Sequence, residues 1–389
     1  MDLRSLPEQL SPFQRINQRR TLVETETGAD LRHLEPRESV IGEAERKNCE
    51  QMFGVVTVPV GYAGPLRIIH AKGHTSDIHL PVATTEGALV ASINRGCKAV
   101  TTAGGAVITE TKHHGISRSI ALRASSATGV QDLVDAIRKN ESVWKQAAEA
   151  TSEHLKILRY DIDIKKQYVF LTLHADTDEA MGMNMVTIAA QAVGAWVAAA
   201  VKGAKCITVA GNVDSDKKPS KRTHERGRGF EVTASVTLSA EVIADTLKST
   251  PADMLGVAKA KLEAGSEIAG AIGKNLHAAN VVAALYLATG QDIAHTVEGS
   301  LADTTVEEGG AGLKVTVRLP AIMVGIRGGG TGLPAQSQCL KLLLRNKSGR
   351  DARTELAEIV AAAVLAGEVS LLAAQASQTL ASAHASLAR

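Results

Sequence analysis

The spacing of apolar positions changes along the chain, and each change predicts a different element. Residues 1–40 are mostly polar, and Leu10, Phe13 and Ile16 are the apolar positions of an expected helical arm that could clamp to another surface. From 55 to 69, β-branched residues mixed with Pro and Gly are typical of strands broken by turns. The arm therefore leads into a separate, sheet-containing body.

The pattern of apolar and polar residues in the segment 119–208 differs from that of the segments on either side. A short apolar strand at 120–124 precedes a helical pattern from Val130 to Ala150, and two stretches with period-2 alternation follow at 155–164 and 168–175. An apolar helix is expected from about Met181 to Val201. This order of strand, helix, two strands and helix predicts a compact α+β insert with an antiparallel sheet.

The segment after residue 208 is expected to belong to the same body as residues 55–118. We expect a basic loop at 211–229, a strand at 230–238, helices at 252–272 and 278–289, a strand at 313–320, a glycine loop from Gly328 and an Ala-rich helical end from about Thr354. The predicted fold class is α+β, with an arm at 1–40, a large domain at 41–118 and 209–389, and an inserted small domain at 119–208. A cleft where the two domains meet is the expected ligand site.

Composition narrows the possible classes of function. The chain has 389 residues, a formal net charge of +2 and 3% aromatic residues, which gives no global signal for a nucleic-acid or membrane partner. The N-terminus lacks the apolar core of a signal peptide, and the longest apolar runs, such as 281–288, are too short to span a bilayer. The cysteines are far apart and show no CxxC pairing: Cys49, Cys97, Cys206 and Cys339. We therefore expect a cytoplasmic protein without a metal site.

Glu86 is the first candidate for chemistry, because it is the only charged residue between Ala83 and Ile93. Apolar residues recur at helical spacing after it, so we place it in the first turn of a helix that packs inward, at the edge of a core. A buried acid there could transfer protons. An acid in a first turn could equally complement the helix dipole.

Two further segments combine acidic and basic residues. In the loop 211–220, Asp216 precedes Lys217 and Lys218, and a lysine held beside carboxylates stays protonated and can stabilise an oxyanion. Because more basic residues follow, a solvated turn is an equally good interpretation: Lys221, Arg222, Arg226 and Arg228. Asp292 follows a glycine at the end of an apolar helix, where the dipole disfavours an acid. It is either an ordinary turn aspartate or the partner of a cation such as Lys217.

Two glycine-containing segments could hold a nucleotide. Gly182 and Asn184 lie at an expected helix start, where free N–H groups favour a pyrophosphate, and the GGGTG loop from Gly328 allows close backbone approach. Neither is a GxGxxG after a strand, so a Rossmann site is not supported, and the nearby methionines could be core filler. His384 lies on an expected terminal helix, where a lone histidine is commonly structural or solvated.

Taken together, these segments resemble the 3-hydroxy-3-methylglutaryl-coenzyme A reductase family in its soluble, prokaryotic-type form. The motifs that carry the resemblance follow in one order along nearly the whole chain: CEQMFGVVTVPVGYAGPL, ATTEGALVASINRGC, GISRSIALR, EAMGMNM, GNVDSDKKP, HAAN, GQD, GGGTGLPAQSQCL and SAH. So many independent motifs in one order are highly specific.

The resemblance implies a two-step hydride reduction of (S)-3-hydroxy-3-methylglutaryl-CoA to (R)-mevalonate and free CoA with two NADPH or NADH, or the reverse oxidation. It further implies that Glu86, Lys217, Asp292 and His384 are catalytic. Lys217 would stabilise the oxyanion, His384 would protonate the departing thiolate, and Glu86 would supply the proton of the second reduction. Glu86 would need to keep a proton near neutrality, which burial and the charge of Asp292 would favour.

The resemblance also assigns binding residues. Those that would hold the hydroxymethylglutaryl group are Arg118, Asp216, Lys218, Lys261 and Asn280. Those that would lie near the nicotinamide cofactor are Glu153, Glu179, Met181, Gly182, Met183, Asn184, Arg327, Gly328 and Gly329. The family fold implies a large, mainly helical domain with a long central helix and small sheets, plus an inserted ferredoxin-like domain that carries the cofactor. Family members form dimers with shared active sites, so the CEQMFG segment and the DKKP loop would meet across an interface and a monomer would be inactive.

The chain departs from the family pattern at several positions. Glu179 replaces an aspartate, and Glu153 stands where many members have an arginine near the 2′-phosphate of the cofactor. A carboxylate repels a phosphate and can accept hydrogen bonds from a ribose, so we hypothesise that NADH is used at least as well as NADPH. Arg327, where a small apolar residue is usual, could supply a compensating cation. Ala210 replaces a serine that contacts substrate, and HAAN is preceded by one residue fewer than usual, so the details of the substrate pocket stay open.

Other readings remain. A related acyl-CoA reductase with a different acyl group is compatible with Ala210. The basic run from Lys217 to Arg228 could bind nucleic acid, although aromatic stacking residues are scarce. A catalytically dead regulatory homologue is the third alternative, but the catalytic residues that the resemblance implies are all present.

Overall fold

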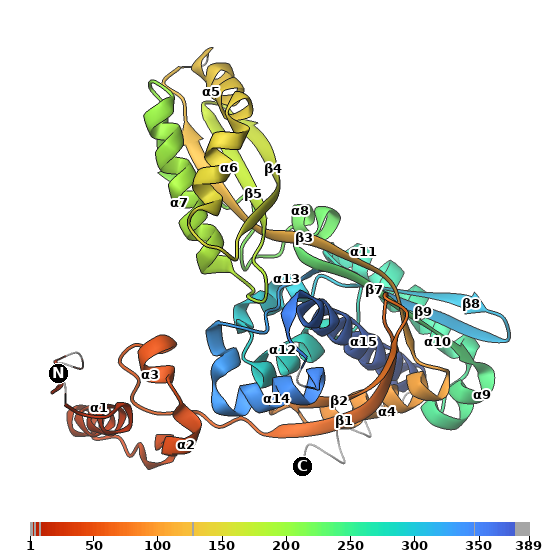
Figure 1. Ribbon diagram of the computed structural model, residues 1–389. Helices are drawn as coiled ribbons and strands as arrows, with labels where there is room; N and C mark the ends of the chain where they lie inside the picture. Colours follow the sequence, from red (N-terminus) through yellow and green to blue (C-terminus); the bar gives the residue numbers. More distant parts are fainter. Residues whose placement is uncertain (1–2, 4, 8, 127, 346, 378–389) are drawn as a thin grey trace.

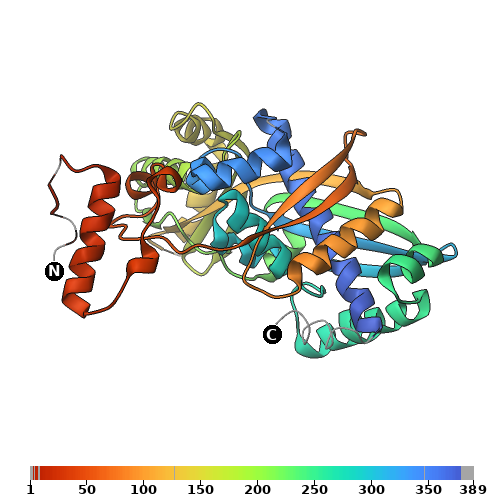
Figure 2. The same cartoon turned by 90° about the horizontal axis from the view of Figure 1, so that it is seen from below.

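The N-terminal arm is a small helical unit with its own apolar centre. The computed structural model describes residues 3, 5–7, 9–126, 128–345 and 347–377. The arm comprises α1 (Pro12–Thr27), η1 (Arg32–Leu34), α2 (Glu38–Ile41) and α3 (Ala44–Lys47). Ser11 and Gln14 form a capping box that starts α1. Ile16 is fully buried against Ile41, Ala44 and Met52, so it packs within the arm rather than onto another surface. The arm stands to one side of the body in both Figure 1 and Figure 2.

The body contains a mixed sheet with the strand order β2-β1-β3-β7-β9-β8. Its neighbouring strands are antiparallel except for the short parallel contact between β1 and β3. The strands are β1 (Val60–Ile69), β2 (Thr75–Ala83), β3 (Ala106–Arg123), β7 (Gly229–Ser239), β8 (Asp303–Gly309) and β9 (Gly312–Ile322). The sequence pattern did not predict β2 or β8, so the body contains a larger sheet than the expected small sheets.

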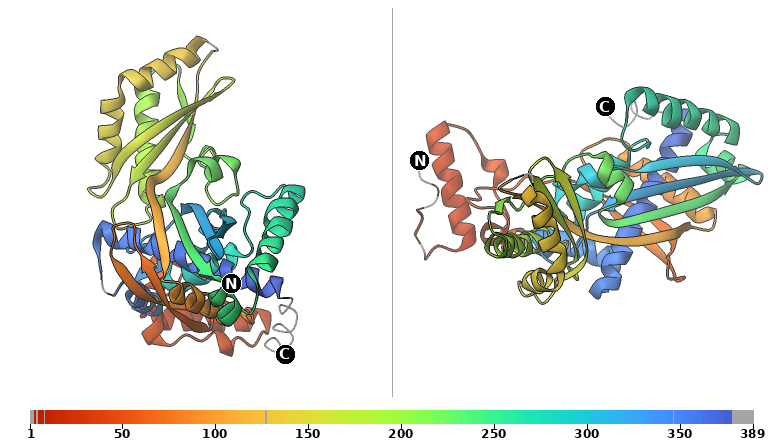
Figure 3. Two further views of the ribbon diagram at one scale, coloured as in Figure 1. Left: turned by 90° about the vertical axis from the view of Figure 1, so that its right-hand side faces the viewer. Right: turned by 90° about the horizontal axis from the view of Figure 1, so that it is seen from above.

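Strand β3 connects the body to a second, smaller lobe, as the left view of Figure 3 shows. Its first half pairs with β7, and its second half, from Ile116, pairs with β5 and β6. Gly115 lies at the transition with φ +79°, and a Cβ there would meet the carbonyl oxygen of Ala175 at 2.9 Å. Glycine therefore permits the change of sheet at this residue.

The small lobe has an antiparallel sheet with the order β4-β5-β3-β6 and a separate apolar core. Its other elements are α5 (Thr128–Lys139), α6 (Glu141–Glu149), β4 (Lys156–Lys165), β5 (Tyr168–Asp176), α7 (Met183–Ala200) and β6 (Lys205–Thr208). The single helix expected from Val130 to Ala150 is wrong, because the helix breaks at Asn140. The ring N–H of Trp144 donates to the carbonyl oxygen of Ile137 at 2.8 Å, which is the acceptor that a continuing helix would offer to the N–H of Glu141.

Helix α15 (Gly349–Ala376) runs through the centre of the body and packs against β7, β9, α4 and α12. It and α7 are long and apolar enough to cross a membrane, contrary to the expectation from the short apolar runs. In α15, 94% of the apolar window is buried inside the protein, which is typical of a core helix. The expected long central helix is therefore present.

The other helices surround this core. They are α4 (Leu89–Thr102), α8 (Lys221–Arg226), α9 (Ala240–Val242), η2 (Ile243–Leu247), α10 (Pro251–Val257), η3 (Ala258–Gly265), α11 (Ser266–Ala269), α12 (Ala278–Thr289), η4 (Ile293–His295), α13 (Thr296–Gly299), η5 (Gly329–Gly332) and α14 (Pro334–Leu344). The helix expected at 252–272 is thus interrupted, because η3 is a π-helical segment between two α-helical ones. Two other expected elements are confirmed, the helix at 278–289 and the strand at 313–320.

Candidate active site

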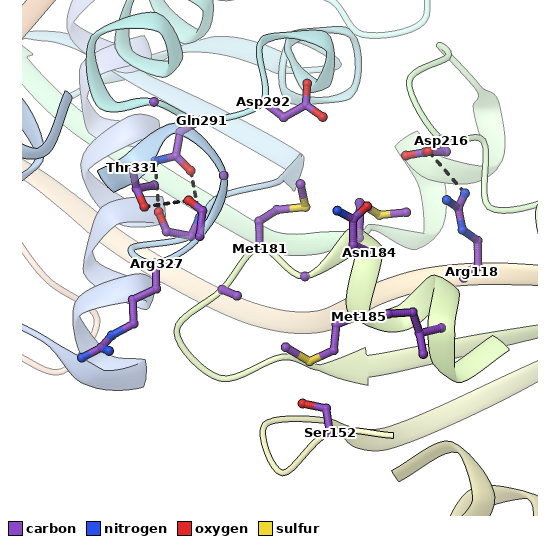
Figure 4. Close-up of a pocket in the computed structure, with 18 of the residues that line it drawn as sticks. Arg118, Ser152, Met181, Asn184, Met185, Asp216, Gln291, Asp292, Arg327 and Thr331 are labelled. Atoms are coloured by element: carbon purple, nitrogen blue, oxygen red, sulfur yellow. Dashed lines mark hydrogen bonds and ion pairs between the residues drawn. The ribbon is translucent and has the colours of Figure 1, made fainter. Parts of the chain in front are cut away.

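A cleft of about 590 Å³ lies where the small lobe meets the body. Figure 4 shows side chains from both units around it. The small lobe contributes Thr151, Ser152 and the start of α7. The body contributes the segment that ends at Asp292 and the glycine loop near Gly328. The expected ligand site at the junction of the two units is therefore present as a cleft.

The start of α7 forms one wall of the cleft. Gly182 is its N-cap in the left-handed conformation, and a Cβ there would meet the Thr177 side chain at 2.4 Å. The backbone N–H groups of the first turn are free for an anion at this position. Predicted cofactor residues line the cleft as a group: Met181, Gly182, Met183, Asn184, Arg327, Gly328 and Gly329.

The glycine loop forms the opposite wall. Gly328 and Gly329 have φ +78° and +54°, and a Cβ on either would meet no atom within 4 Å. Gly290 and Gly330 approach so closely that a Cβ on Gly290 would lie 2.3 Å from the Gly330 carbonyl oxygen. Asn48 of the arm donates to the carbonyl oxygen of Gly329 at 3.0 Å, so the arm contacts this wall.

Lys217 and Asp292 meet in the cleft, which agrees with the second of the two interpretations of Asp292, the partner of a cation. Lys217 Nζ lies 2.8 Å from Asp292 Oδ2, and both residues line the cleft. Burial would raise the pKa of Asp292, but the hydrogen bond from Lys217 and the other nearby groups hold the pKa below its ordinary value. Asp292 is therefore ionised at neutral pH beside the ammonium group.

Arg118 and Asp216 also line the cleft and pair with each other. Arg118 Nη1 lies 3.3 Å from Asp216 Oδ2, and Arg118 Nε donates to Thr187 at 3.0 Å. Burial opposes ionisation of Asp216, but Arg228 and Arg118 lower its pKa below the usual value. This wall therefore combines a guanidinium with an ionised carboxylate.

Several functional candidates were not recognised from the sequence. Arg228 belongs to the basic run for which a solvated turn is one interpretation, yet it is 1% exposed and bonds to Asp216. His295 and Glu298 are fully buried beside it. The sequence did contain a signal for this cluster, because three titratable residues recur at every third position: Asp292, His295 and Glu298.

Glu86 and Asn280 come together at a distance from this lining. Asn280 Nδ2 donates to Glu86 Oε2 at 2.7 Å, but neither residue lines the cleft in the single chain. Glu86 lies three residues before the start of α4, so the prediction that it belongs to the first helical turn is wrong. Its side chain is exposed in the single chain, so the predicted burial is also not found there. The turn around Ala88, with φ +69°, delays the start of the helix.

The other residues that were predicted to bind substrate do not all lie in the lining of the cleft. Lys218 is exposed and donates to the carbonyl oxygen of Asp216 at 3.0 Å. Lys261 is exposed on η3 and does not line the cleft. His384 lies outside the described residues.

The two departures at Glu179 and Arg327 form one ion pair. Arg327 Nε contacts Glu179 Oε2, and the Arg327 side chain extends away from the cleft in Figure 4. Glu179 also accepts from the backbone N–H of Gly349 at 2.5 Å. Glu153 is exposed beside Ser152, at the edge of the lining but not in it.

Comparison with solved structures defines the class of fold. The class II 3-hydroxy-3-methylglutaryl-CoA reductase of Streptococcus pneumoniae, solved bound to NADPH in open conformations, matches with a TM-score of 0.70 at 20% identity. The match covers 92% of this chain and 96% of that chain. The fold is therefore that of the class II reductases.

Sequence comparison gives the family. A model of the hydroxymethylglutaryl-coenzyme A reductase family matches residues 15–389. The 3-hydroxy-3-methylglutaryl-coenzyme A reductase of Methanothermobacter thermautotrophicus is 41% identical over 374 residues, covering 95% of this chain and 92% of the relative, and that of Haloferax volcanii has the same identity and coverage. The chain belongs to the hydroxymethylglutaryl-coenzyme A reductase family and is an NAD(P)H-dependent oxidoreductase.

Proposed function

We propose that the cleft reduces (S)-3-hydroxy-3-methylglutaryl-CoA to (R)-mevalonate and free CoA, or catalyses the reverse oxidation, through Lys217 and its partner Asp292. The observation that carries this proposal is the 2.8 Å ion pair inside a cleft lined by a helix N-terminus and a glycine loop. A cation fixed beside a nucleotide-sized cleft is suited to stabilise charge that develops on a carbonyl oxygen.

The cleft suits a nicotinamide dinucleotide. The free N–H groups at the start of α7 can receive a pyrophosphate, and the open space over Gly328 and Gly329 permits close approach. Such a cofactor, when bound, supplies hydride to the carbonyl carbon. Met181, Met183 and Asn184 would hold and orient it.

Lys217 would act on the substrate oxygen. As the thioester carbonyl is reduced, its oxygen gains negative charge, which the ammonium group of Lys217 would stabilise. The ionised carboxylate of Asp292 keeps this ammonium group in place. Arg118 with Asp216, and Lys218 beside them, would hold the carboxylate end of the hydroxymethylglutaryl group.

Glu86 would supply the proton of the second reduction, and His384 would protonate the departing CoA thiolate. In a single chain Glu86 is exposed, its partner Asn280 is half-buried, and Lys261 is exposed. These residues would complete the site only if a second chain covers them. We therefore propose a homodimer, or a higher even oligomer, with shared active sites.

We further propose that NADH serves at least as well as NADPH. Glu153 stands beside the cleft where it would repel a 2′-phosphate, and the guanidinium of Arg327 is already paired with Glu179. Neither Glu153 nor the paired Arg327 therefore offers a free positive charge to the 2′-phosphate of NADPH.

The arrangement of the small lobe supports a ferredoxin-like domain. Read along the chain, its strands β3, β4, β5 and β6 take the antiparallel order β6-β3-β5-β4, with helices in the first and last connections. We propose the division into an arm that extends past the expected residue 40 to include α3, a large domain formed by the rest of 41–118 and by 209–389, and a cofactor domain at 119–208. We also propose that the enzyme works in the cytoplasm.

A paired substitution tests the role of Lys217. The oxidation of NADH and of NADPH is followed by absorbance with hydroxymethylglutaryl-CoA for the parent, Lys217→Ala and the control Lys221→Ala. Removal of one oxyanion donor should lower kcat by about 100- to 1000-fold. Lys221 is exposed at the start of α8, in the segment that the sequence predicted as a basic loop, and pairs with Glu225 one helical turn later. Its removal should therefore leave kcat within about twofold. Parental activity in Lys217→Ala would contradict the proposed function.

A further inference from the structure

Glu298 is a fully buried carboxylate directly behind Lys217. It lies on the short helix α13, and its Oε1 accepts the backbone N–H of Lys217 at 2.6 Å. A buried carboxylate is costly unless it is paired and hydrogen-bonded. The contact that it makes to the backbone of the proposed catalytic lysine is therefore informative about its role.

The backbone of Lys217 needs such support. Lys217 has φ +58°, in the left-handed region that residues with a side chain rarely adopt, and Ser215 in the same loop has φ +52°. Residues persist in this conformation only when the surrounding structure holds them there. The hydrogen bond to Glu298 fixes the amide at the residue whose side chain must reach Asp292.

Glu298 is itself held by the buried guanidinium of Arg228, and the His295 ring lies beside it without a hydrogen bond to any of the described residues. Arg228 Nη1 donates to Glu298 Oε1 at 2.7 Å, and His295 Nδ1 lies 3.4 Å from the same oxygen. His295 Nε2 lies 3.6 Å from Asp292 Oδ2, the oxygen that accepts from Lys217. The buried cluster therefore contacts both the backbone of Lys217 and the partner of its side chain.

A metal ion is a poorer interpretation of this cluster. Asp216, His295 and Glu298 have potential ligand atoms within 4.8 Å of one another. However, the Arg228 guanidinium already bonds to both carboxylates, at 3.1 Å and 2.7 Å. Its charge occupies the place of a cation, so the cluster serves to hold side chains.

We propose that Glu298 is a positioning residue that fixes the left-handed backbone at Lys217 and thereby aims the ammonium group at Asp292 and the substrate oxygen. The proposal rests on the catalytic role of Lys217 proposed above. It predicts that the length of the side chain at position 298, more than its charge, determines the reaction rate.

Two conservative substitutions separate length from charge. Glu298→Gln keeps the length and an oxygen that accepts the Lys217 amide, whereas Glu298→Asp keeps the charge and withdraws the acceptor by one methylene. Because a misplacement of 1 Å can cost about 100-fold, kcat should fall by about 10- to 100-fold in Glu298→Asp but stay within about tenfold in Glu298→Gln. The KM for the nicotinamide should change by less than about threefold in both, since its site is not altered.

Glu358→Asp is the matched control. Glu358 is also a buried glutamate with hydrogen bonds, to His70 and Thr111, but it lies away from the cleft. The same shortening there should lower the melting temperature without lowering kcat more than about twofold. Melting temperatures of all variants show whether a loss of rate reflects loss of fold.

A double substitution identifies the route of the effect. In the Lys217→Ala background, Glu298→Asp should cause no further loss of residual kcat, because two residues that act as a unit are not additive. Glu298→Asp that is as active as Glu298→Gln, or additive loss in the double variant, would overturn the proposal. A fully active Lys217→Ala would instead show that the proposed function has failed.

Discussion

At Arg327 and Glu179, two unusual residues compensate each other. The guanidinium that could have received a 2′-phosphate is held by a carboxylate whose other oxygen accepts the Gly349 amide. The pair therefore ties the connection between β5 and α7 to the glycine loop and to the start of α15. Its consequence for the cofactor can be measured.

Glu179→Ala should release Arg327 and increase the use of NADPH. In the parent, kcat/KM with NADH should at least equal that with NADPH, and a freed guanidinium near the cleft should shift this ratio toward NADPH by about tenfold, as one charge-assisted contact would. The measurement is the ratio of the two kcat/KM values. The double variant Glu179→Ala with Arg327→Ala is the control and should lose the shift, while a parent that prefers NADPH a hundredfold would exclude the NADH hypothesis.

Residue chemistry could predict part of the site. The unfavourable position of Asp292 at a helix end indicated a cationic partner, and the structure places Lys217 there at 2.8 Å. The burial of Arg228 and Glu298 could not be predicted from their positions in the sequence. A basic run looks the same in sequence whether its arginines are solvated or paired with carboxylates that come from a distant segment.

At the scale of elements, the backbones of α4 and α15 approach each other closely where the two helices cross. A Cβ on Gly96 would lie 1.8 Å from the carbonyl oxygen of Ala366, so only glycine fits between the two backbones. Gly96→Ala should therefore lower the free energy of unfolding by about 1–3 kcal/mol or more through overpacking. Denaturant unfolding measures this loss.

Gly256→Ala is the matched control for that substitution. Gly256 lies in α10, and a Cβ there would meet no atom within 4 Å. The free energy of unfolding should stay equal or rise by about 0.5–1 kcal/mol, because alanine is the better helix former. Equal stability of the two alanine variants would show that α4 and α15 can separate without cost.

His113 on β3 should make stability depend on pH. Burial, and after it the charge of Arg353, lowers the pKa of His113 to about 4. The unfolded chain, with an ordinary histidine near 6.5, binds more protons than the folded protein between these values, so the free energy of unfolding should fall as pH drops from 6.5 toward 4. The slope from one proton is at most about 1.4 kcal/mol per pH unit. Denaturant midpoints at several pH values should show a shallower decline for His113→Gln.

The elements themselves were predictable where the apolar period was long and regular, as in α7, α12, β4 and β5. The break at Asn140 was not predictable, because the Trp144 side chain occupies the carbonyl oxygen of Ile137 without changing the apolar period. Strand β3 was recognised only over its last residues. Its first half pairs with β7, whose residues lie more than a hundred positions away, as in the pairing of Ile108 with Ala234.

For the whole molecule, shared active sites predict complementation between inactive variants. If Glu86 of one chain serves Lys217 of another, a mixture of Glu86→Ala and Lys217→Ala subunits, unfolded and refolded together, contains some sites without either substitution. About a quarter of parental activity should return in random dimers. Sites built within one chain would each keep one substitution, and the mixture would then stay inactive. The oligomeric state of each sample is measured by sedimentation.

The contact between Asn48 and Gly329 makes the arm a natural place for an optical reporter. Cys49 follows Asn48 and is exposed, whereas Cys97 is buried and its pKa is raised by burial to about 12. The pKa values of Cys206 and Cys339 are also raised by burial. In a single chain, before the proposed dimer assembles, a thiol-reactive fluorophore would therefore attach selectively at Cys49, one residue from the side chain that bonds to the glycine loop. Its emission would follow occupancy of the cleft in real time, without any turnover of substrate.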